Sequence, residues 1–392
     1  MNNSISIFLQ ERIDAGDFPS AVYLVAERGE IVIHEALGHA VVEPELIAAR
    51  KDTIYDLASL TKVLVTCLSC AKLVENDEID PSDKLSTYFS EFETKEKRSI
   101  LLRDLLTHTS GFQAWVPFYL EQNAPSIDSH HFMGTTTERI DNFILNDIGI
   151  RTLTHPLNSK VVYSDLNFLI LGFLIERIFG TSLDSVADTE GFMRLGLTRT
   201  FMGGKVTLRR EIAANEKGNA FEKQTCVDLG YLTPREYKSG TDKHFRTETI
   251  WGEVHDNNAY FMGGVAGHAG LFSTAEEVFK IAQQFLPNYT SLLKSETCAL
   301  FRTNFTVGMN EHRSFAFQLA STPDSTAGTK MSPESFGHLG FTGTSLWIDP
   351  IKERVFILLT NRTHNHALPF VNINSVRRRF HDLAIDFLNE NT

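Results

Sequence analysis

The sequence predicts an α+β protein in which one antiparallel sheet is built from both ends of the chain. Two apolar hairpins carry this prediction, one at residues 21–34 and one at 345–359. Strands joined by such short turns must be antiparallel, so the simplest assembly places both hairpins in one sheet. Helical patterns flank the sheet at both termini, and further helical patterns fill the chain between the hairpins. A mainly helical domain is therefore inserted into the sheet domain.

The N-terminal end predicts a helix followed by a hairpin. Apolar residues recur at helical spacing at Ile5, Phe8, Leu9 and Ile13. The following apolar segments, 21–26 and 31–34, flank the turn 27–30.

The C-terminal end mirrors this order, with a hairpin followed by a helix. Strands are expected at 345–348 and 355–359, and a terminal helix is expected from Val376 to Leu388. Helical patterns in the middle of the chain lie at 63–74, 101–106, 140–148 and 166–178. The segment 185–255 is charged and has no regular pattern. We expect a sheet domain of residues 1–58 and 261–392, a helical domain of residues 59–260, and the active site at their interface.

Composition excludes several classes of protein. The 392 residues are 42% hydrophobic and carry 37 Lys and Arg against 49 Asp and Glu, a formal net charge of −12. This acidic balance without a long basic stripe makes nucleic acid an unexpected partner. The longest apolar runs, such as 355–359, are too short to cross a bilayer, so a soluble protein without membrane insertion is expected. Composition does not define the oligomeric state.

The cysteines and the first residues bear on the compartment. Four cysteines are too few and too unevenly spaced for a disulfide framework, and Cys67 and Cys70 fall inside a predicted helix, where buried thiols are expected. The chain opens without a positively charged segment followed by an apolar one. The sequence as given therefore predicts a cytoplasmic protein, or a periplasmic or secreted one if a leader has been removed.

Ser59 and Lys62 form the first candidate for chemistry. They lie three residues apart in the first turn of a predicted helix that Asp56 can cap, so both side chains share one face. A serine hydroxyl becomes a nucleophile when a neighbouring group takes its proton, and a lysine can do this if its ammonium is destabilised. The spacing alone is weak, because it recurs at Ser69/Lys72 and Ser291/Lys294.

Two further motifs follow along the chain. Tyr163 and Asp165 stand at the entry to an apolar helix, where the phenol could relay a proton from the serine to a leaving group. The segment from His338 to Thr344 leads into the strand that contains Trp347, and small residues on an edge strand allow a backbone N–H to face a reacting carbonyl. The pattern His-x-Gly also occurs at 268–270, so it too is weak alone.

In this order, the three motifs resemble those of the serine β-lactamase and penicillin-binding protein superfamily, whose pattern is Ser-x-x-Lys, Tyr-x-Asn or Ser-x-Asn, and Lys-Thr-Gly. The resemblance is strongest to the class C branch with its esterases and D-aminopeptidases. Segments whose sequences are similar to those of this branch are spread over nearly the whole chain, at 55–62, 105–111, 263–272 and 337–350. The fold that the resemblance implies agrees with a sheet made from both chain ends.

The resemblance also implies roles for individual residues. Ser59 would be the acylated nucleophile, Lys62 its proton acceptor or electrostatic partner, and Tyr163 a second acid or base. The backbone N–H groups of Ser59 and Phe341 would form the oxyanion hole, and water would hydrolyse the acyl-enzyme. The implied substrate-binding residues are Asp165, His338, Gly340 and Thr342. No cofactor and no metal are implied.

The sequence departs from the family pattern at two positions. Asp165 replaces the usual Asn, so it would favour a charged Lys62, shift the duty of base towards Tyr163, and remove an amide donor for the substrate. His338 replaces the usual Lys, so we expect a charge that titrates near neutral pH and a pH-dependent activity. These changes favour hydrolysis of a small ester, amide or D-amino acid peptide over efficient β-lactam hydrolysis.

Other functions remain open on sequence grounds. One alternative is a true β-lactamase or DD-peptidase, and another is a penicillin-recognising binding or sensor protein that is acylated without turnover. A zinc hydrolase is disfavoured, because His34 and His39 are five residues apart in a strand pattern and cannot share a helix face. An α/β-hydrolase is disfavoured because the chain has no Gly-x-Ser-x-Gly motif.

Overall fold

The computed structural model describes residues 3–121, 124–125, 135–233, 235 and 244–391. Its main feature is a seven-stranded sheet in the order β3-β2-β1-β10-β9-β8-β7, in which all neighbours are antiparallel. The strands are β1 (Ser20–Glu27), β2 (Glu30–Val41), β3 (Ile47–Ala48), β7 (Gln318–Leu319), β8 (Phe336–Leu339), β9 (Ser345–Asp349) and β10 (Arg354–Thr360). The predicted α+β class, with a sheet from both chain ends, is confirmed.

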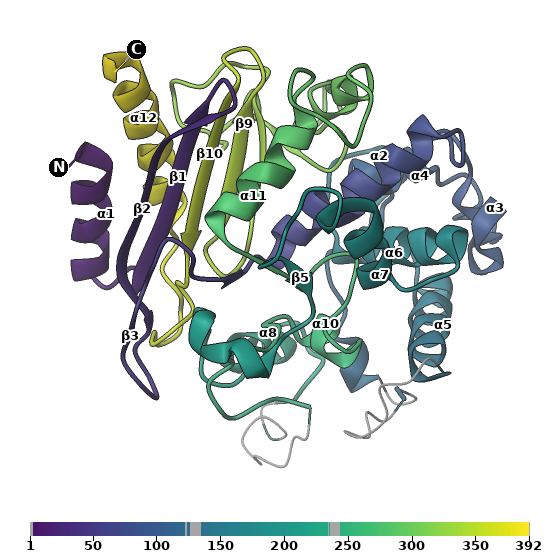
Figure 1. The fold of residues 1–392 in the computed structure, drawn as a ribbon. Helices are drawn as coiled ribbons and strands as arrows, with labels where there is room; N and C mark the ends of the chain where they lie inside the picture. The colour runs from purple at the N-terminus through teal and green to yellow at the C-terminus, as the bar shows by residue number, and fades with distance from the viewer. Residues whose placement is uncertain (1–2, 122–123, 126–134, 234, 236–243, 392) are drawn as a thin grey trace.

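Pairing between β1 and β10 joins the two ends of the chain. Seven residue pairs link these strands, from Ala21 opposite Thr360 to Glu27 opposite Arg354. The terminal helices α1 (Ser4–Asp14) and α12 (Asn374–Asn391) lie together on one face of the sheet (Figure 1). Helix α11 (Ala275–Ala282) packs against β1 and β10 from the other face (Figure 1). Both faces are thus covered, which explains why β1 and β10 are nearly continuous apolar runs.

The inserted region is mainly helical and lies beside the sheet (Figure 1). Its helices are α2 (Leu68–Glu75), α3 (Leu85–Tyr88), α4 (Leu102–Leu106), α5 (Thr135–Ile150), α6 (Asp165–Phe179), α7 (Leu183–Ala187), α8 (Ala220–Asp228) and α10 (Asn257–Phe261). A small three-stranded sheet is formed by β4 (Tyr55–Asp56), β6 (Leu271–Ser273) and β5 (Phe201–Met202). The domain boundaries 58/59 and 260/261 stay a prediction.

The predicted helix at 63–74 has an unexpected start. Residues Ala58–Leu60 form a 3₁₀ turn, Lys62–Cys67 form a π-helical segment, and only then does α2 begin. π segments inside helices are frequent at functional sites. Cys67 and Cys70 are free and buried here, as predicted.

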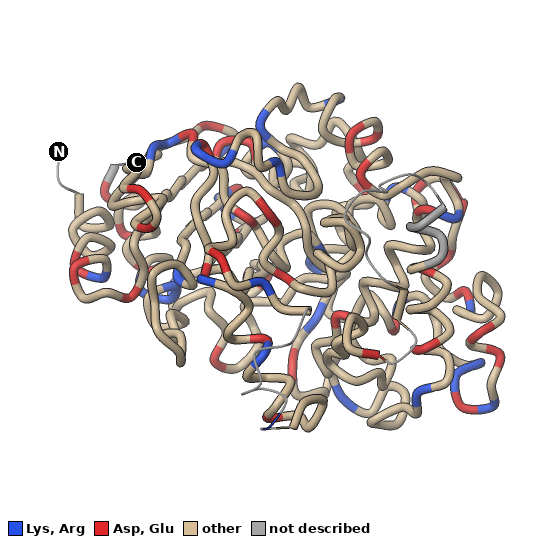
Figure 2. The backbone as a smooth tube through the Cα atoms, turned by 90° about the horizontal axis from the view of Figure 1, so that it is seen from below, with Lys and Arg blue, Asp and Glu red and all other residues tan. Residues whose placement is uncertain are grey.

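Charged residues are distributed over the described chain, and in Figure 2 the blue and red segments alternate along it. No single helix in the described ranges is long and apolar enough to cross a membrane. The pair Asp165–Phe179 and Leu183–Phe192, bent by 74°, has the length and composition of a broken span.

Candidate active site

Ser59 is held in a constrained turn between the two parts of the fold. The preceding residue, Ala58, has a φ of 48°, which is unusual for a residue with a side chain. Its N–H donates to Asp56 Oδ1 at 2.9 Å, while Asp56 Oδ2 accepts the N–H of His255 at 2.7 Å. Asp56 therefore fixes the turn that presents Ser59, but the predicted helix cap is wrong, because Ala58 is left-handed and the 3₁₀ turn that begins there has Leu57 as its N-cap, without a side-chain hydrogen bond.

Lys62 is fully buried, and its ammonium points at three oxygen atoms. Nζ lies 3.0 Å from Ser59 Oγ, 3.0 Å from the backbone oxygen of His268 and 2.7 Å from Asp165 Oδ1. Burial by itself would lower the pKa of Lys62, but the nearby Asp165 and Tyr163 raise it overall. Lys62 is therefore an ammonium at neutral pH, in agreement with the expected effect of Asp165.

Tyr163 is positioned by the loop that follows α4. The N–H of Ser164 donates to His108 Nδ1 at 3.1 Å, and the hydroxyl of Ser164 donates to the backbone oxygen of Gln113 at 2.7 Å. The rings of His108 and Tyr163 pack with centroids 4.7 Å apart. Burial raises the pKa of Tyr163, although hydrogen bonds to Lys62 and Ser59 partly oppose this. Tyr163 is thus a neutral phenol in contact with both Ser59 and Lys62.

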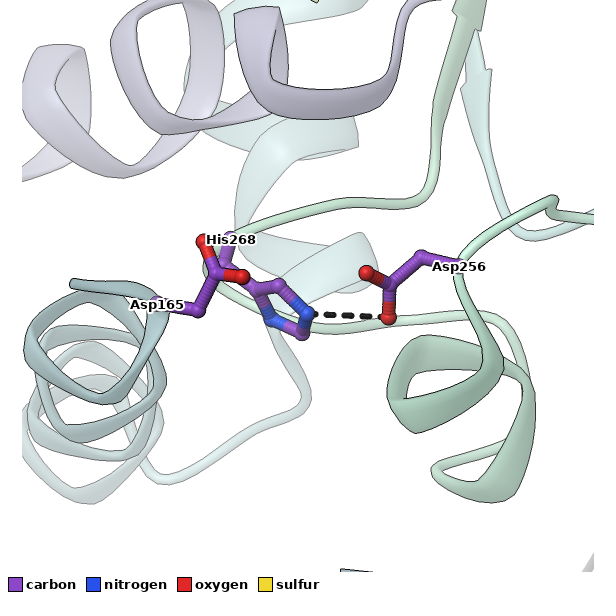
Figure 3. A group of neighbouring side chains, drawn as sticks. All are labelled: Asp165, Asp256 and His268. Atoms are coloured by element: carbon purple, nitrogen blue, oxygen red, sulfur yellow. Dashed lines mark hydrogen bonds and ion pairs between the residues drawn. The ribbon is translucent and has the colours of Figure 1, made fainter. Parts of the chain in front are cut away.

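Asp165, Asp256 and His268 meet in the site (Figure 3), and both Asp165 and the backbone oxygen of His268 contact Lys62. His268 Nε2 and Asp256 Oδ1 form a hydrogen bond at 3.0 Å, while Asp165 faces the ring of His268 from the start of α6 (Figure 3). Burial would raise the pKa of Asp256, but His268 and the N–H of Ala259 lower it strongly overall. The three residues offer ligand atoms within 4.8 Å of one another, yet Lys62 and His268 already supply positive charge or donors to the two carboxylates.

His338 lies on β8 at the opposite side of the site. The ring Nδ1 interacts with the backbone oxygen of Leu339 at 2.9 Å, and the ring centroid is 5.7 Å from that of Tyr163. Burial, together with Arg313 and Lys62, lowers the pKa of His338 well below the usual value. The expected titration of His338 near neutrality is therefore wrong, because two cations and burial keep the imidazole neutral.

The segment after β8 has the tight geometry expected of the third motif. A Cβ at Gly340 would lie 1.9 Å from Thr344 Oγ1 and 2.5 Å from the backbone oxygen of Leu57, so only glycine fits. The hydroxyl of Thr342 donates to the backbone oxygen of Asp56 at 2.8 Å, and Thr342 is buried. Thr342 therefore joins β8 to the Ser59 turn, and its predicted role in substrate binding stays a prediction.

The two backbone N–H groups predicted for the oxyanion hole have no partner elsewhere. Within the described residues, neither Ser59 N–H nor Phe341 N–H donates a hydrogen bond. Strand β7 pairs only with Phe336 and Gly337, so the outer edge of β8 is open from His338 onwards. Both N–H groups can therefore donate a hydrogen bond to an incoming oxygen atom.

A cleft of about 670 Å³ connects these groups. Its lining includes Ser59, Tyr163, Asp165, His338, Gly340 and Phe341, together with Trp115, Phe221, Glu222, Asp256, Arg313, Arg362 and Arg377. The other two Ser-x-x-Lys matches lie elsewhere, since Lys72 pairs with Glu190 and the backbone N–H of Lys294 donates to Glu75. The structure thus singles out Ser59 and Lys62 from the three matches.

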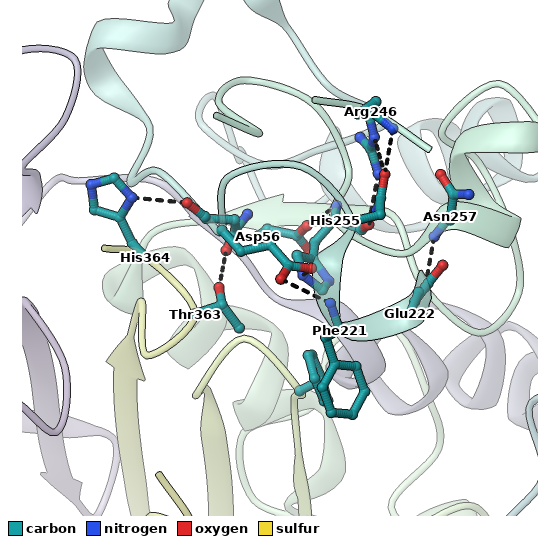
Figure 4. A network of polar contacts seen from close by, with 12 residues as sticks. Asp56, Phe221, Glu222, Arg246, His255, Asn257, Thr363 and His364 are labelled. Atoms are coloured by element: carbon teal, nitrogen blue, oxygen red, sulfur yellow. Dashed lines mark hydrogen bonds and ion pairs between the residues drawn. The ribbon is translucent and has the colours of Figure 1, made fainter. Parts of the chain in front are cut away.

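A buried polar network supports one wall of the cleft (Figure 4). His255 Nε2 contacts Glu216 Oε1 at 2.9 Å, and this pairing overcomes burial to raise the pKa of His255. The rings of His255 and Phe341 stack with centroids 5.4 Å apart, and the Phe221 ring packs against that of Phe341 with centroids 4.6 Å apart. Glu222, further along this wall, has a pKa raised to about 8 by burial and by Asp256. The network therefore connects the Ser59 turn, through Asp56, to Phe341.

Sequence reasoning missed four residues at the site: His108, Asp256, His268 and Arg313. His268 was seen in the sequence only as a repeat of the His-x-Gly pattern, although its backbone oxygen accepts a hydrogen bond from Lys62 across 206 residues. His108 and His268 lie in two of the segments whose sequences resemble the family, and this resemblance could have pointed to them. No local signal points to Asp256 or Arg313.

A scan against models of protein families matches the model "Beta-lactamase" over residues 7–377. The chain belongs to the β-lactamase family. It is therefore a serine hydrolase of the β-lactamase family, with the fold that the sequence predicts.

Curated relatives of this β-lactamase-family chain cover nearly all of it. One, from Escherichia coli strain K12, is described as "Putative D-alanyl-D-alanine carboxypeptidase" and is 30% identical over 386 residues, 93% of this chain and 82% of the relative. Another, from Salmonella agona strain SL483, has the same description and is 33% identical over 397 residues, 94% of this chain and 84% of the relative.

Solved structures share the fold at lower identity. EstCE1, described as a hydrolase with promiscuous acyltransferase activity, has a TM-score of 0.71, 18% identity and 97% coverage of both chains. A class C β-lactamase from Rhodobacter sphaeroides has a TM-score of 0.67, 14% identity and coverage of 99% of this chain and 100% of its own.

Proposed function

We propose that this β-lactamase-family protein hydrolyses a small ester, amide or D-amino acid peptide through an acyl-enzyme at Ser59. The observation that carries the proposal is the 3.0 Å contact between Ser59 Oγ and the Lys62 ammonium, at a cleft that exposes two free backbone N–H groups. A nucleophile beside a cation and an oxyanion hole are the parts that acyl transfer needs.

In the proposed reaction, Ser59 Oγ attacks the substrate carbonyl carbon. The N–H groups of Ser59 and Phe341 stabilise the negative charge that develops on the carbonyl oxygen. Tyr163 takes the proton of Ser59 while its own phenolic proton passes to the leaving alkoxide or amine, so no free base is needed. Lys62, kept as an ammonium by Asp165, stabilises the charge on Ser59 Oγ and on Tyr163 during the transfer. Water then attacks the acyl-enzyme by the reverse path.

Several features of the cleft favour small esters and amides over β-lactams. The neutral imidazole of His338 supplies no positive charge for the carboxylate of a β-lactam. Asp165 offers a carboxylate where an amide would donate a hydrogen bond to the acylamino carbonyl of such a substrate. The cleft also contains the aromatic rings of Trp115, Phe221 and Phe341, which suit an apolar acyl or leaving group.

A peptide ending in a carboxylate is the second candidate substrate. Arg313 lines the cleft, and its charge lowers the pKa of His338, so a cation does lie at this end of the site. Arg313 Nη2 forms an ion pair with Glu311 Oε1 at 2.6 Å, but Arg313 Nε is buried without a hydrogen-bond partner. The curated relatives described as "Putative D-alanyl-D-alanine carboxypeptidase" give further support to such a peptide.

The test is intact-protein mass spectrometry with parallel measurement of product. A short-chain p-nitrophenyl ester, a D-alanyl-D-alanine peptide and a penicillin are each incubated with the wild-type protein and with Ser59→Ala. We expect turnover of the ester or the peptide, and a loss of at least about 10³-fold in Ser59→Ala, as in other serine hydrolases that lose the nucleophile. Retained activity in that variant would reject the mechanism. A single equivalent of product without turnover would identify a binding or sensor protein instead.

A further inference from the structure

Arg377 in α12 is a buried cation without a carboxylate partner. Its side chain is 5% exposed, and the ion pairs of the described chain include none to this residue. Burial and the nearby Arg362 lower its pKa to about 9, so it stays charged at neutral pH. A buried charge without a counter-ion opposes folding, so the fold retains Arg377 at the expense of stability.

The hydrogen bonds of Arg377 show where this charge acts. Its Nη2 donates to the backbone oxygen of Gly340 at 2.9 Å and to that of Thr344 at 3.0 Å, and its Nη1 donates to Asn374 Oδ1 at 2.9 Å. The oxygen of Gly340 belongs to the same peptide group as the N–H of Phe341. In a trans peptide these two bonds point in opposite directions, so fixing the carbonyl also fixes the direction of the N–H.

A second guanidinium fixes the next peptide group. Arg362 Nε donates to the backbone oxygen of Phe341 at 2.7 Å, and the guanidinium lies 4.9 Å from the centre of the Phe341 ring. The ring itself packs against Phe221 and His255 on the network of Figure 4. Phe341 is therefore held at its ring and at the carbonyl on each side of its α-carbon, while its N–H remains free.

We infer that Arg377 is a positioning residue that orients and polarises the Gly340–Phe341 peptide, so that the Phe341 N–H is a stronger oxyanion donor. The inference rests on the proposed function, because it needs the Phe341 N–H in the oxyanion hole. A cation that donates to the carbonyl of an amide draws electron density from its N–H, and hydrogen bonds in such chains strengthen one another. The positive charge also adds to the field at the developing oxyanion.

The test compares Arg377→Gln and Arg377→Lys with the control Arg378→Gln. Arg378 lies on the same helix and also donates to a backbone oxygen, that of Ser325 at 3.0 Å, but it does not line the cleft. Loss of an oxyanion donor costs about 10²–10³-fold in kcat, so weakening one should cost about 10- to 100-fold in Arg377→Gln. We expect a smaller loss in Arg377→Lys, a KM within about threefold of wild type in both, and wild-type kinetics in Arg378→Gln.

A spectroscopic measurement separates polarisation from a merely structural role. The acyl-enzyme is formed with a p-nitrophenyl ester labelled with ¹³C at its carbonyl, and the carbonyl stretch is recorded by infrared difference spectroscopy. Weaker hydrogen bonding in Arg377→Gln should move the stretch to higher wavenumber, with a smaller shift in Arg377→Lys. If Arg377→Gln does not fold, the shift in Arg377→Lys decides the question.

The inference and the proposed function fail in different ways. An unchanged carbonyl stretch in the Arg377 variants, or an equal loss of activity in Arg378→Gln, would overturn the role of Arg377 while acylation at Ser59 stood. An adduct that persists in Ser59→Ala would instead reject the proposed function itself.

Discussion

At the level of single residues, the charge of Lys62 depends first on the carboxylate of Asp165 and then on Tyr163. Burial opposes the ammonium, and Asp165, 2.7 Å away, is the ionic partner that reverses this effect. An opposite charge at such a distance typically shifts a pKa by about one to three units. Asp165, which stands where the family pattern has an amide, thus favours the charged form of Lys62.

We predict that Asp165→Asn lowers the pKa of Lys62, because burial is then opposed much less. If the ammonium is the active form, the alkaline limb of the kcat/KM profile moves to lower pH by about one to three units. Asp165→Glu keeps the charge and should keep the limb close to its wild-type position. The profile is measured with the ester between pH 5 and pH 10. An acid limb that moves instead, with activity gained at low pH, would show that neutral Lys62 is the base.

Some of these residues were predictable from the sequence and some were not. Ser59 and Lys62 are one turn apart, so their contact follows from local geometry, and Tyr163 follows from the family pattern. The lowered pKa of His338 could not be predicted, because it depends on burial in the folded chain and on the nearby charges of Arg313 and Lys62. The buried position of Thr342 likewise depends on its contact with Asp56, 286 residues away.

At the level of elements, the helix α6 and the loop before β6 touch through two glycines. A Cβ at Gly267 would lie 2.0 Å from the backbone oxygen of Phe168 and 3.0 Å from Gly172 Cα. In the same loop, the backbone oxygen of Gly267 accepts a hydrogen bond from the Thr66 hydroxyl, and that of His268 accepts one from the Lys62 ammonium. Close approach of this loop to α6 therefore sets the position of an oxygen that holds Lys62.

We predict that Gly267→Ala destabilises the protein by about 2–3 kcal/mol, because backbone atoms on both sides must move apart. Activity should also fall, since the displaced loop carries the oxygen that holds Lys62. The measurement is urea unfolding together with ester turnover. The control is Gly191→Ala, where a Cβ meets nothing within 4 Å, and it should stay within about 0.5 kcal/mol of wild type. Equal stability of the two variants would contradict the close contact.

The sequence predicted the long elements better than the short ones. The helices of the two termini have clear apolar periodicity, and the strands β1, β9 and β10 are apolar runs bounded by turns, so they were expected within a few residues. Strand β2 was expected only at 31–34, but it continues to Val41. The two-residue strand β7 has no such pattern, and its pairing with β8 depends on the whole sheet. The π segment at Lys62–Cys67 was also missed, because apolar spacing does not distinguish it from an α-helix.

At the level of the whole molecule, the sheet separates two hydrophobic clusters. Along β10, Val355, Ile357 and Leu359 belong to the cluster shared with the helical region, whereas Phe356 and Leu358 belong to the cluster under α1 and α12. The larger cluster runs without a break from β1 through α6 to α11. The sheet and the helical region should therefore unfold together, even though the sequence suggests two domains.

We predict that the protein unfolds in a single transition, and that Phe356→Ala moves this transition equally for every probe of unfolding. Truncation of a buried Phe to Ala costs about 3–5 kcal/mol, and this residue is buried at the face remote from the cleft. The fluorescence of Trp347 reports on the cluster under the terminal helices, and that of Trp251 reports on the larger cluster. Phe356→Ala is introduced into the wild type and, separately, into Trp347→Phe, and each protein is unfolded in urea. The shift in midpoint relative to the corresponding parent protein should be the same in both backgrounds. A shift confined to the Trp347 signal would show that the two parts unfold separately, because the destabilised face would then open without the rest of the molecule.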